Sequence, residues 1–319
     1  MTPRTRTALA ATLAALLLFP TAALPWYPKV RGESTLPESG AIQVVGNYFS
    51  RPAREGDTLV QLARDYGLGY GAMVRANPGI DPWLLKRGQT VRFPCPVILP
   101  EAPRPGIVVN LAELRLFLYW QEKGKWRVRI YPVGIGDRGW ETPTGEFSIR
   151  QVVALPSWTP PPSLRREHPD LPPVVPPGPD NPLGDYWLGF SREGFGLHGT
   201  NAPFGIGRRV SHGCIRLYPE DIRDLVKRVG RGTPVRIVYR PIKVGIRNDI
   251  LYVESHHDYL EKIDAPLQEI VSRARAAGWS SPLPAAALEK ILAENRGIPV
   301  PVARRTSKDG FLNRQAINE

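Results

Sequence analysis

The sequence predicts a mainly β protein with a small α+β module in front of it. From Ile107 to Val153 apolar and polar residues alternate in short runs that turn residues separate, which is the pattern of half-buried strands. Between residues 57 and 76 the apolar residues recur at helical spacing instead. Proline, at 35 of 319 residues, favours rigid loops over a helical bundle.

The first residues have the composition of an export signal. Arg4 and Arg6 precede an apolar run over 8–19, and small residues follow it. This order is typical of a secretory signal, so we expect residues 1–23 to be one, with cleavage after Ala23. An uncleaved signal would be the only contact with the membrane. The sequence thus predicts an exported protein.

The charge indicates an anionic partner. Lys and Arg number 42 against 30 Asp and Glu, a net charge of +12. We find no nucleic-acid-binding motif and no basic stripe interleaved with aromatic residues, so we expect no nucleic acid partner.

Residues 42–95 are expected to form the small module. Asp57 is predicted to cap a first helix, and a second short helix near 70–76 ends before Pro78. The stretch resembles a LysM module, a βααβ fold that binds carbohydrate, and the resemblance implies binding to the glycan of peptidoglycan. The matching residues are Gly56, Asp57, Thr58, Leu59, Asn77, Pro78, Leu85, Gly88 and Val91.

The rest of the chain divides by composition. We expect a proline-rich linker over 96–106, a β-rich domain over 107–240 and a β/helical extension over 241–295. Residues 296–319 are predicted to be a disordered tail. Within the β-rich domain, 155–182 holds too many prolines to pair in a sheet and is expected to be a long loop, ordered or mobile, of the kind that is usually functional or disordered. A helix is predicted from Pro219.

The segment Ser211–Leu217, "SHGCIRL", carries the candidate chemistry. A cysteine nucleophile needs a base or a positive field beside it, because the thiolate is its reactive form. His212 could take the proton of Cys214 if the chain turns at Gly213, and Arg216 adds positive charge. These features predict a pKa for Cys214 below 8.5.

Three other interpretations of Cys214 remain open at this point. It could be an inert buried thiol. It could form a disulfide with Cys95, the second cysteine, as an exported protein allows. It could also bind zinc with His198 and His212, but a fourth ligand at suitable spacing is missing. We expect neither a metal ion nor a cofactor.

The motifs "HGT" and "SHGCIRL" resemble the signature of L,D-transpeptidases with a YkuD-type catalytic domain. The likeness extends over roughly 108–255. It implies a β-sandwich with a short helix after the cysteine. It also implies a periplasmic enzyme that acylates Cys214 with a peptidoglycan tetrapeptide stem, releases D-alanine and passes the acyl group to an amine.

The resemblance also assigns roles to individual residues. Cys214 would be the nucleophile and His212 the proton acceptor and donor, with Gly213 in the catalytic turn. The residues expected to position or bind the substrate are His198, Gly199, Thr200, Ser211 and Arg216. For Arg216, a structural salt bridge is the alternative.

Several functions agree with these residues. The amine acceptor would come from a second stem, giving a 3-3 cross-link, or from an outer-membrane lipoprotein lysine. With water as acceptor the protein would be an L,D-carboxypeptidase or another hydrolase. A non-catalytic wall-binding protein that works through LysM alone is the third alternative.

Overall fold

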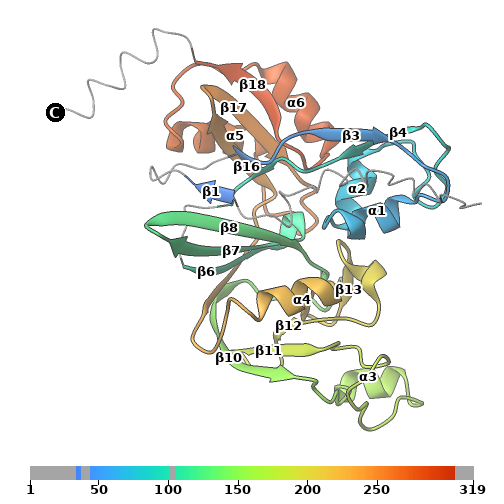
Figure 1. Cartoon of the computed structure of the whole chain (residues 1–319). Coiled ribbons are helices and arrows are strands. Elements are labelled where there is room, and N and C mark those ends of the chain that lie inside the picture. Colours follow the sequence, from blue (N-terminus) through green and yellow to red (C-terminus); the bar gives the residue numbers. More distant parts are fainter. Residues whose placement is uncertain (1–33, 37–43, 101–104, 306–319) are drawn as a thin grey trace, which may run out of the picture.

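The computed structural model describes residues 34–36, 44–100 and 105–305. In them a curled, mixed sheet has the strand order β1-β8-β7-β6-β15-β10-β11-β12-β14 (Figure 1). This confirms the mainly β prediction. The strands are β1 (Ser34–Leu36), β6 (Gly106–Asn110), β7 (Arg115–Glu122), β8 (Lys125–Pro132), β10 (Gly145–Ala154), β11 (Tyr186–Phe190), β12 (Gly196–His198), β14 (Ile215–Arg216) and β15 (Pro234–Val238).

Both faces of the central strands are covered, and β6 is therefore buried at all its positions. Val109 belongs to one core together with Ile222 of α4 (Pro219–Leu225), the helix that the sequence predicted after Arg216. Val108 faces the other way into a second core with Val97. Successive residues of a strand point to opposite faces, so one strand contributes to both cores.

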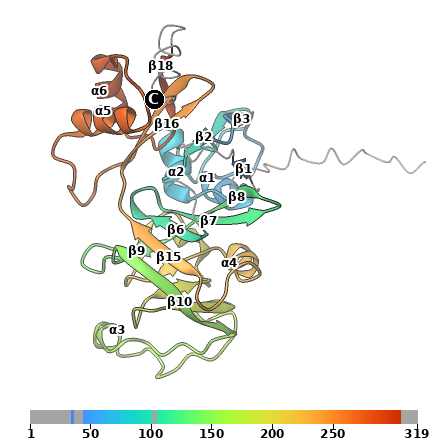
Figure 2. The same ribbon diagram turned by 90° about the vertical axis from the view of Figure 1, so that its left-hand side faces the viewer.

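Short elements join the strands around the candidate site. They are η1 (Leu111–Glu113), β9 (Ile135–Gly136), α3 (Pro162–Glu167), η2 (Pro203–Gly205) and β13 (Arg209–Ser211). β13 pairs in parallel with β9. Two perpendicular views place α3 at the opposite end of the molecule from α5 and α6, described below (Figures 1 and 2).

The module in front has the βααβ order β3 (Phe49–Pro52), α1 (Leu59–Asp65), α2 (Tyr70–Ala76) and β4 (Thr90–Phe93), with β3 and β4 antiparallel. The prediction that Asp57 caps the first helix is wrong by one residue. Thr58 Oγ1 accepts from Gln61 N at 3.0 Å and caps α1. The Asp57 carboxylate turns back to Arg54 N and Arg51, at 2.7 and 2.8 Å.

The segment predicted as a linker is buried in its first half. β5 (Val97–Ile98) pairs with β2 (Val44–Val45), and Leu99 is 2% exposed. Prolines on either side of "VIL" suggested a loop, but these three apolar residues fill the space between the module and the sheet. The module is therefore held against the sheet by part of the connecting segment.

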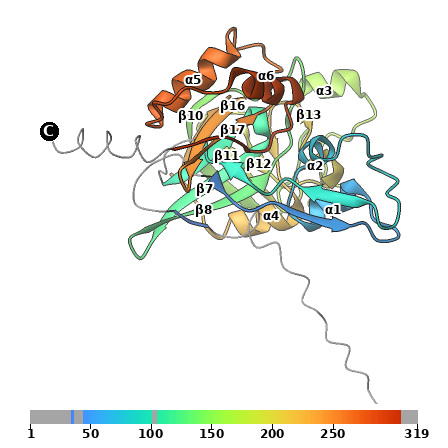
Figure 3. The same ribbon diagram turned by 90° about the horizontal axis from the view of Figure 1, so that it is seen from above.

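Residues 241–305 form a C-terminal unit of β16 (Ile242–Arg247), β17 (Ile250–Ser255), β18 (Val300–Arg304), α5 (Pro266–Ala276) and α6 (Ala285–Glu294). The helices expected before residue 295 are confirmed. The prediction of a disordered tail from residue 296 is wrong as far as residue 305, because β18 pairs with β17. β18 is an edge strand containing Pro301, which obscured its strand signal. From above, α5 and α6 lie along one margin and α4 along the opposite one (Figure 3).

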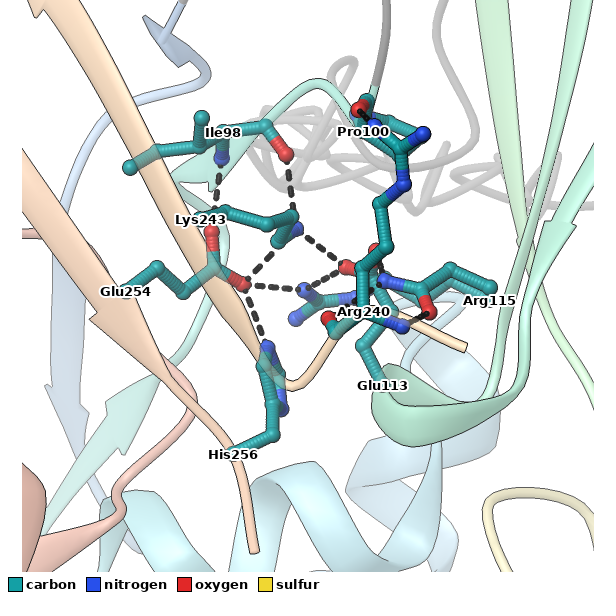
Figure 4. Close-up of polar contacts among 9 residues, drawn as sticks. Ile98, Pro100, Glu113, Arg115, Arg240, Lys243, Glu254 and His256 are labelled. Carbon is teal, nitrogen blue, oxygen red and sulfur yellow. Dashed lines mark hydrogen bonds and ion pairs between the residues drawn. The ribbon is translucent and has the colours of Figure 1, made fainter. Parts of the chain in front are cut away.

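A buried set of charges connects this unit to the rest of the chain (Figure 4). Lys243 Nζ contacts Glu113 Oε2 at 2.6 Å and Glu254 Oε1 at 3.2 Å. Arg115 Nη1 contacts both carboxylates at 3.0 Å. Glu254 also accepts from Ile98 N at 2.7 Å. Burial would raise the pKa of Glu254, but the neighbouring positive charges, Lys243 foremost, lower it to about 2.

The predicted signal over 1–23 lies outside the described residues. Within the described part of the chain, no helix combines the length and the apolar character that a membrane crossing requires.

Candidate active site

Two strands bring the candidate residues together. β12 and β14 pair in parallel, with His198 opposite Arg216. The turn from β13 into β14 carries Ser211, His212, Gly213 and Cys214. The "HGT" and "SHGCIR" motifs, which are separate in the sequence, are therefore neighbours in space.

The turn has a conformation that only glycine adopts easily. Gly213 has φ +100, and a Cβ there would lie 2.7 Å from the ring of Phe195. The carbonyl of Gly213 accepts from Thr142 Oγ1 at 2.9 Å, and Ser211 Oγ donates to the carbonyl of Cys214 at 2.5 Å. Both hydroxyl groups are buried and hold the backbone on either side of the cysteine.

Cys214 has a free, partly buried thiol whose Sγ donates to the carbonyl of Gly194 at 3.4 Å. Burial raises its pKa to about 11, outweighing the opposing effects of a backbone hydrogen bond from Gly196 and the charge of Arg216. This contradicts the prediction of a pKa below 8.5 for Cys214. The sequence showed the nearby charge but not the depth at which the thiol lies.

His212 lies between an aromatic ring and a carboxylate. Its ring centroid is 4.7 Å from that of Trp140, and its Nε2 is 4.0 Å from Glu167 Oε2 of α3. Sequence reasoning missed Glu167, because no spacing rule connects a residue of the proline-rich loop with the histidine. The only available signal was the expectation that this loop has a function.

His198 is buried and uncharged. Desolvation lowers its pKa to about 3, and its Nδ1 donates to the carbonyl of Gly199 at 2.7 Å. Gly199 packs closely, since a Cβ there would lie 3.2 Å from Ile222. Thr200 is 3% exposed, and its Oγ1 accepts from Ala202 N at 3.0 Å. These residues form a rigid wall beside Arg216.

Arg216 is a half-buried cation. Its backbone pairs with Gly134 at 2.8 and 2.9 Å, which fixes its position. No carboxylate among the described residues forms an ion pair with it, and its Nε is buried without a hydrogen-bond partner. Burial lowers its pKa. The structural salt bridge considered from the sequence is therefore not formed, and the guanidinium can take an anion.

Neither cysteine is in a disulfide, so the Cys95–Cys214 disulfide is not formed. Cys95 is 1% exposed in the core of the module. Three potential metal ligands among the described residues come within 4.8 Å of one another at Glu113, Glu254 and His256, not at the zinc set considered above. There Lys243 and Arg115 already neutralise the carboxylates.

The proline-rich loop is ordered by one buried side chain. Asn181 Nδ2 donates to the carbonyls of Pro156, Val175 and Pro176 at 2.7, 3.3 and 3.1 Å. A bridge between Trp158 and Val175 closes the loop, with α3 inside it. The expectation that no pairing occurs in this loop is wrong at that bridge. The bridge returns the chain so that Glu167 reaches His212.

Comparisons with known proteins agree along the chain. The YkuD-type L,D-transpeptidase catalytic domain matches residues 104–237, and the LysM domain matches 53–94. "Probable L,D-transpeptidase YcfS" of Escherichia coli K12 is 39% identical over 282 residues, covering 84% of this chain and 88% of that protein. "Probable L,D-transpeptidase ErfK/SrfK" of the same strain is 40% identical over 290 residues, covering 89% and 84%. "Putative L,D-transpeptidase YkuD" of Bacillus subtilis is 31% identical over 189 residues, covering 58% and 95%.

Proposed function

Because the chain belongs to the L,D-transpeptidase family and combines its YkuD-type catalytic domain with a LysM domain, we propose that it transfers a peptidoglycan acyl group through Cys214. The observation that carries this proposal is the free thiol of Cys214. It lies on a turn that Gly213 and Thr142 fix, close to the half-buried guanidinium of Arg216, which has no ion-pair partner among the described residues.

In the first step the sulfur of Cys214 adds to the carbonyl of the third residue in a tetrapeptide stem. His212 takes the thiol proton as the carbon–sulfur bond forms. The carbon–nitrogen bond then breaks, and the proton returns to the amine of D-alanine, which leaves. A thioester remains on the enzyme. Burial raises the pKa of this thiol to about 11 and so favours its neutral form, which is why a base has to remove the proton before or during the attack.

The charges of the site suit an anionic stem. Arg216 would bind a carboxylate of the donor, because pairing neutralises a half-buried cation whose Nε has no hydrogen-bond partner. Glu167 would stabilise the ring of His212 while it carries the proton. Uncharged His198 with Thr200 would form the opposite wall.

In the second step an amine attacks the thioester. It would come from a second stem, which gives a 3-3 cross-link, or from an outer-membrane lipoprotein lysine. The LysM module would bind the glycan while the stem reacts, and the protein would then work in the periplasm or cell envelope. Attack by water instead would make the protein an L,D-carboxypeptidase.

Product analysis on defined muropeptides tests the proposal. Incubation with a disaccharide tetrapeptide is expected to give a dimer or, with an added D-amino acid, an exchanged fourth residue. A shortened stem alone would show that water is the acceptor. An unchanged substrate with the wild-type protein would leave wall binding through LysM as its function.

A further inference from the structure

The LysM module lies directly on the segment that leads into the catalytic turn. The first backbone N–H groups of α2 have no partner within their own helix. Two of them donate to the catalytic domain, Tyr70 N to Ile206 O at 3.1 Å and Gly71 N to Gly207 O at 3.2 Å. The preceding cap residue, Gly69, has no side chain to do this. The catalytic domain therefore caps the module's helix.

The approach is too close for any side chain on the two facing glycines. A Cβ on Gly69 would lie 2.9 Å from Gly207 Cα, and one on Gly207 would lie 2.6 Å from the carbonyl carbon of Gly69. Gly207 also has φ +82, which disfavours other residues. Beside the glycines, the guanidinium of Arg208 lies 3.7 Å from the ring centroid of Tyr70.

The far side of this segment is held by the sheet. Gly207 N donates to Val133 O at 3.0 Å, and Ile135 N donates to Arg208 O at 3.1 Å. The chain then enters β13, which pairs with β9 and ends at Ser211. A few paired residues therefore connect α2 with the segment that leads to His212.

A second contact lies beyond the turn. Glu220, in the first turn of α4, forms a two-pronged ion pair with Arg64 of α1, with both N–O distances 3.1 Å. Tyr218 Oη donates to Leu68 O at 3.2 Å. The module thus touches the chain both before His212 and after Arg216.

The C-terminal unit holds the module in this position. Arg247 Nη1 donates to Gly46 O at 2.7 Å, and Tyr48 Oη donates to Pro299 O. Ile98 of the buried connecting segment packs against Tyr252, and its backbone joins the charges of Figure 4. These contacts give residues 241–305 a structural role.

We propose that Gly69 and Tyr70 of the LysM module are positioning residues for the catalytic turn, so that the module takes part in catalysis as well as in wall binding. The catalytic half of this inference rests on the proposed function. The docking half does not, because the environment of the Cys214 thiol can be measured without a substrate.

The test uses full-length variants and a tetrapeptide donor that carries no glycan. Binding of LysM to glycan therefore cannot influence the rate at which this donor reacts. In Gly69→Ala one methyl group is added where no space exists. Its matched control is Gly230→Ala, whose Cβ would meet nothing within 4 Å. Tyr70→Ala removes the ring over Arg208, and Tyr70→Phe restores it.

We expect Gly69→Ala and Tyr70→Ala to lower kcat about tenfold with little change in KM or in pull-down by sacculi. Tyr70→Phe and Gly230→Ala are expected to keep the wild-type kcat. Iodoacetamide should alkylate Cys214 about threefold faster in the first two variants, while Cys95, buried in the module core, stays slow. Rapid alkylation of Cys95 would identify a variant that has lost its fold. The test then rests on the other variant.

Wild-type values of kcat and of Cys214 alkylation in both Gly69→Ala and Tyr70→Ala would overturn the inference. If the wild-type protein turns over no donor, the proposed function fails, but the ratio of Cys214 to Cys95 alkylation still tests the docking. An unchanged ratio would then refute the docking on its own.

Discussion

At the scale of single residues, the site combines a neutral thiol with an unpaired cation. Burial raises the pKa of Cys214 to about 11, and Arg216 has no anion among the described residues. The cation is unfavourable until a carboxylate binds to it. The neutral thiol is the form that burial favours, and it has to lose its proton before or while it forms a thioester. The reactivity of Cys214 should therefore be low in the resting protein.

The alkylation of Cys214 is expected to keep rising up to about pH 11, because only roughly one thiol in 10⁴ is ionised at pH 7 when the pKa is 11. Iodoacetamide labelling followed by peptide mass spectrometry measures the rate at each pH. A rate that already levels off near pH 7 would mean that the thiol is a thiolate at rest and that burial does not dominate.

Glu167→Gln should lower turnover about two- to fivefold. Half-exposed pairs such as Glu167 and His212, 4.0 Å apart, contribute less than about 1 kcal/mol, and salt screens them. The wild-type advantage should therefore shrink at high ionic strength, whereas Asp170→Asn, an exposed carboxylate of the same loop, should have no effect. An equal loss of turnover in both variants would mean that the overall charge of the loop affects turnover, and not the contact of Glu167 with His212.

At the scale of elements, the sequence predicted the catalytic turn better than its surroundings. "SHGC" contains its own turn chemistry, and the pairing of β12 with β14 brought His198 to Arg216. Thr142 and Glu167 could not be found in this way, because their partners lie far along the chain and only the folded sheet brings them together. The buried β5 and the edge strand β18 were missed because their prolines indicated loops.

Thr142→Val should reduce both stability and activity. The hydroxyl donates to Gly213 O and accepts from Gly136 N at 3.0 Å, and its loss leaves buried polar groups unpaired at about 1–3 kcal/mol. We expect turnover to fall about tenfold because the turn is released. Thr142→Ser keeps the hydroxyl and should retain most of the stability and most of the activity. Urea unfolding measures the first and initial rates measure the second. Equal stability and equal turnover of Thr142→Val and Thr142→Ser would show that these hydrogen bonds do not hold the turn.

At the scale of the whole molecule, the module, the sheet and the C-terminal unit are connected by buried contacts. The charges around Lys243 and Glu254 connect β5, η1, β7, β16 and β17. Sequence reasoning divided the chain at changes of composition, and such changes do not show which surfaces meet after folding.

Lys243→Met should destabilise the protein by about 3–5 kcal/mol, because one of the cations beside two buried carboxylates is lost. The exposed Lys227→Met is the control and should stay within about 0.5 kcal/mol of the wild type. The pKa of Glu254, about 2, is lowered, so its stabilisation exists above its ordinary pKa and is lost as the pH falls toward 2. A loss below about 1 kcal/mol for Lys243→Met in urea unfolding would contradict this assignment.

The most direct measurement of the central claim is the intact mass of the protein after rapid quenching with a tetrapeptide stem. We expect a covalent adduct with the mass of the stem minus D-alanine, mapped to the peptide of Cys214 and absent in Cys214→Ala. In His212→Ala the adduct should form far more slowly, because no group takes the thiol proton. Release of D-alanine by Cys214→Ala at the wild-type rate, or an adduct on another residue, would contradict the account.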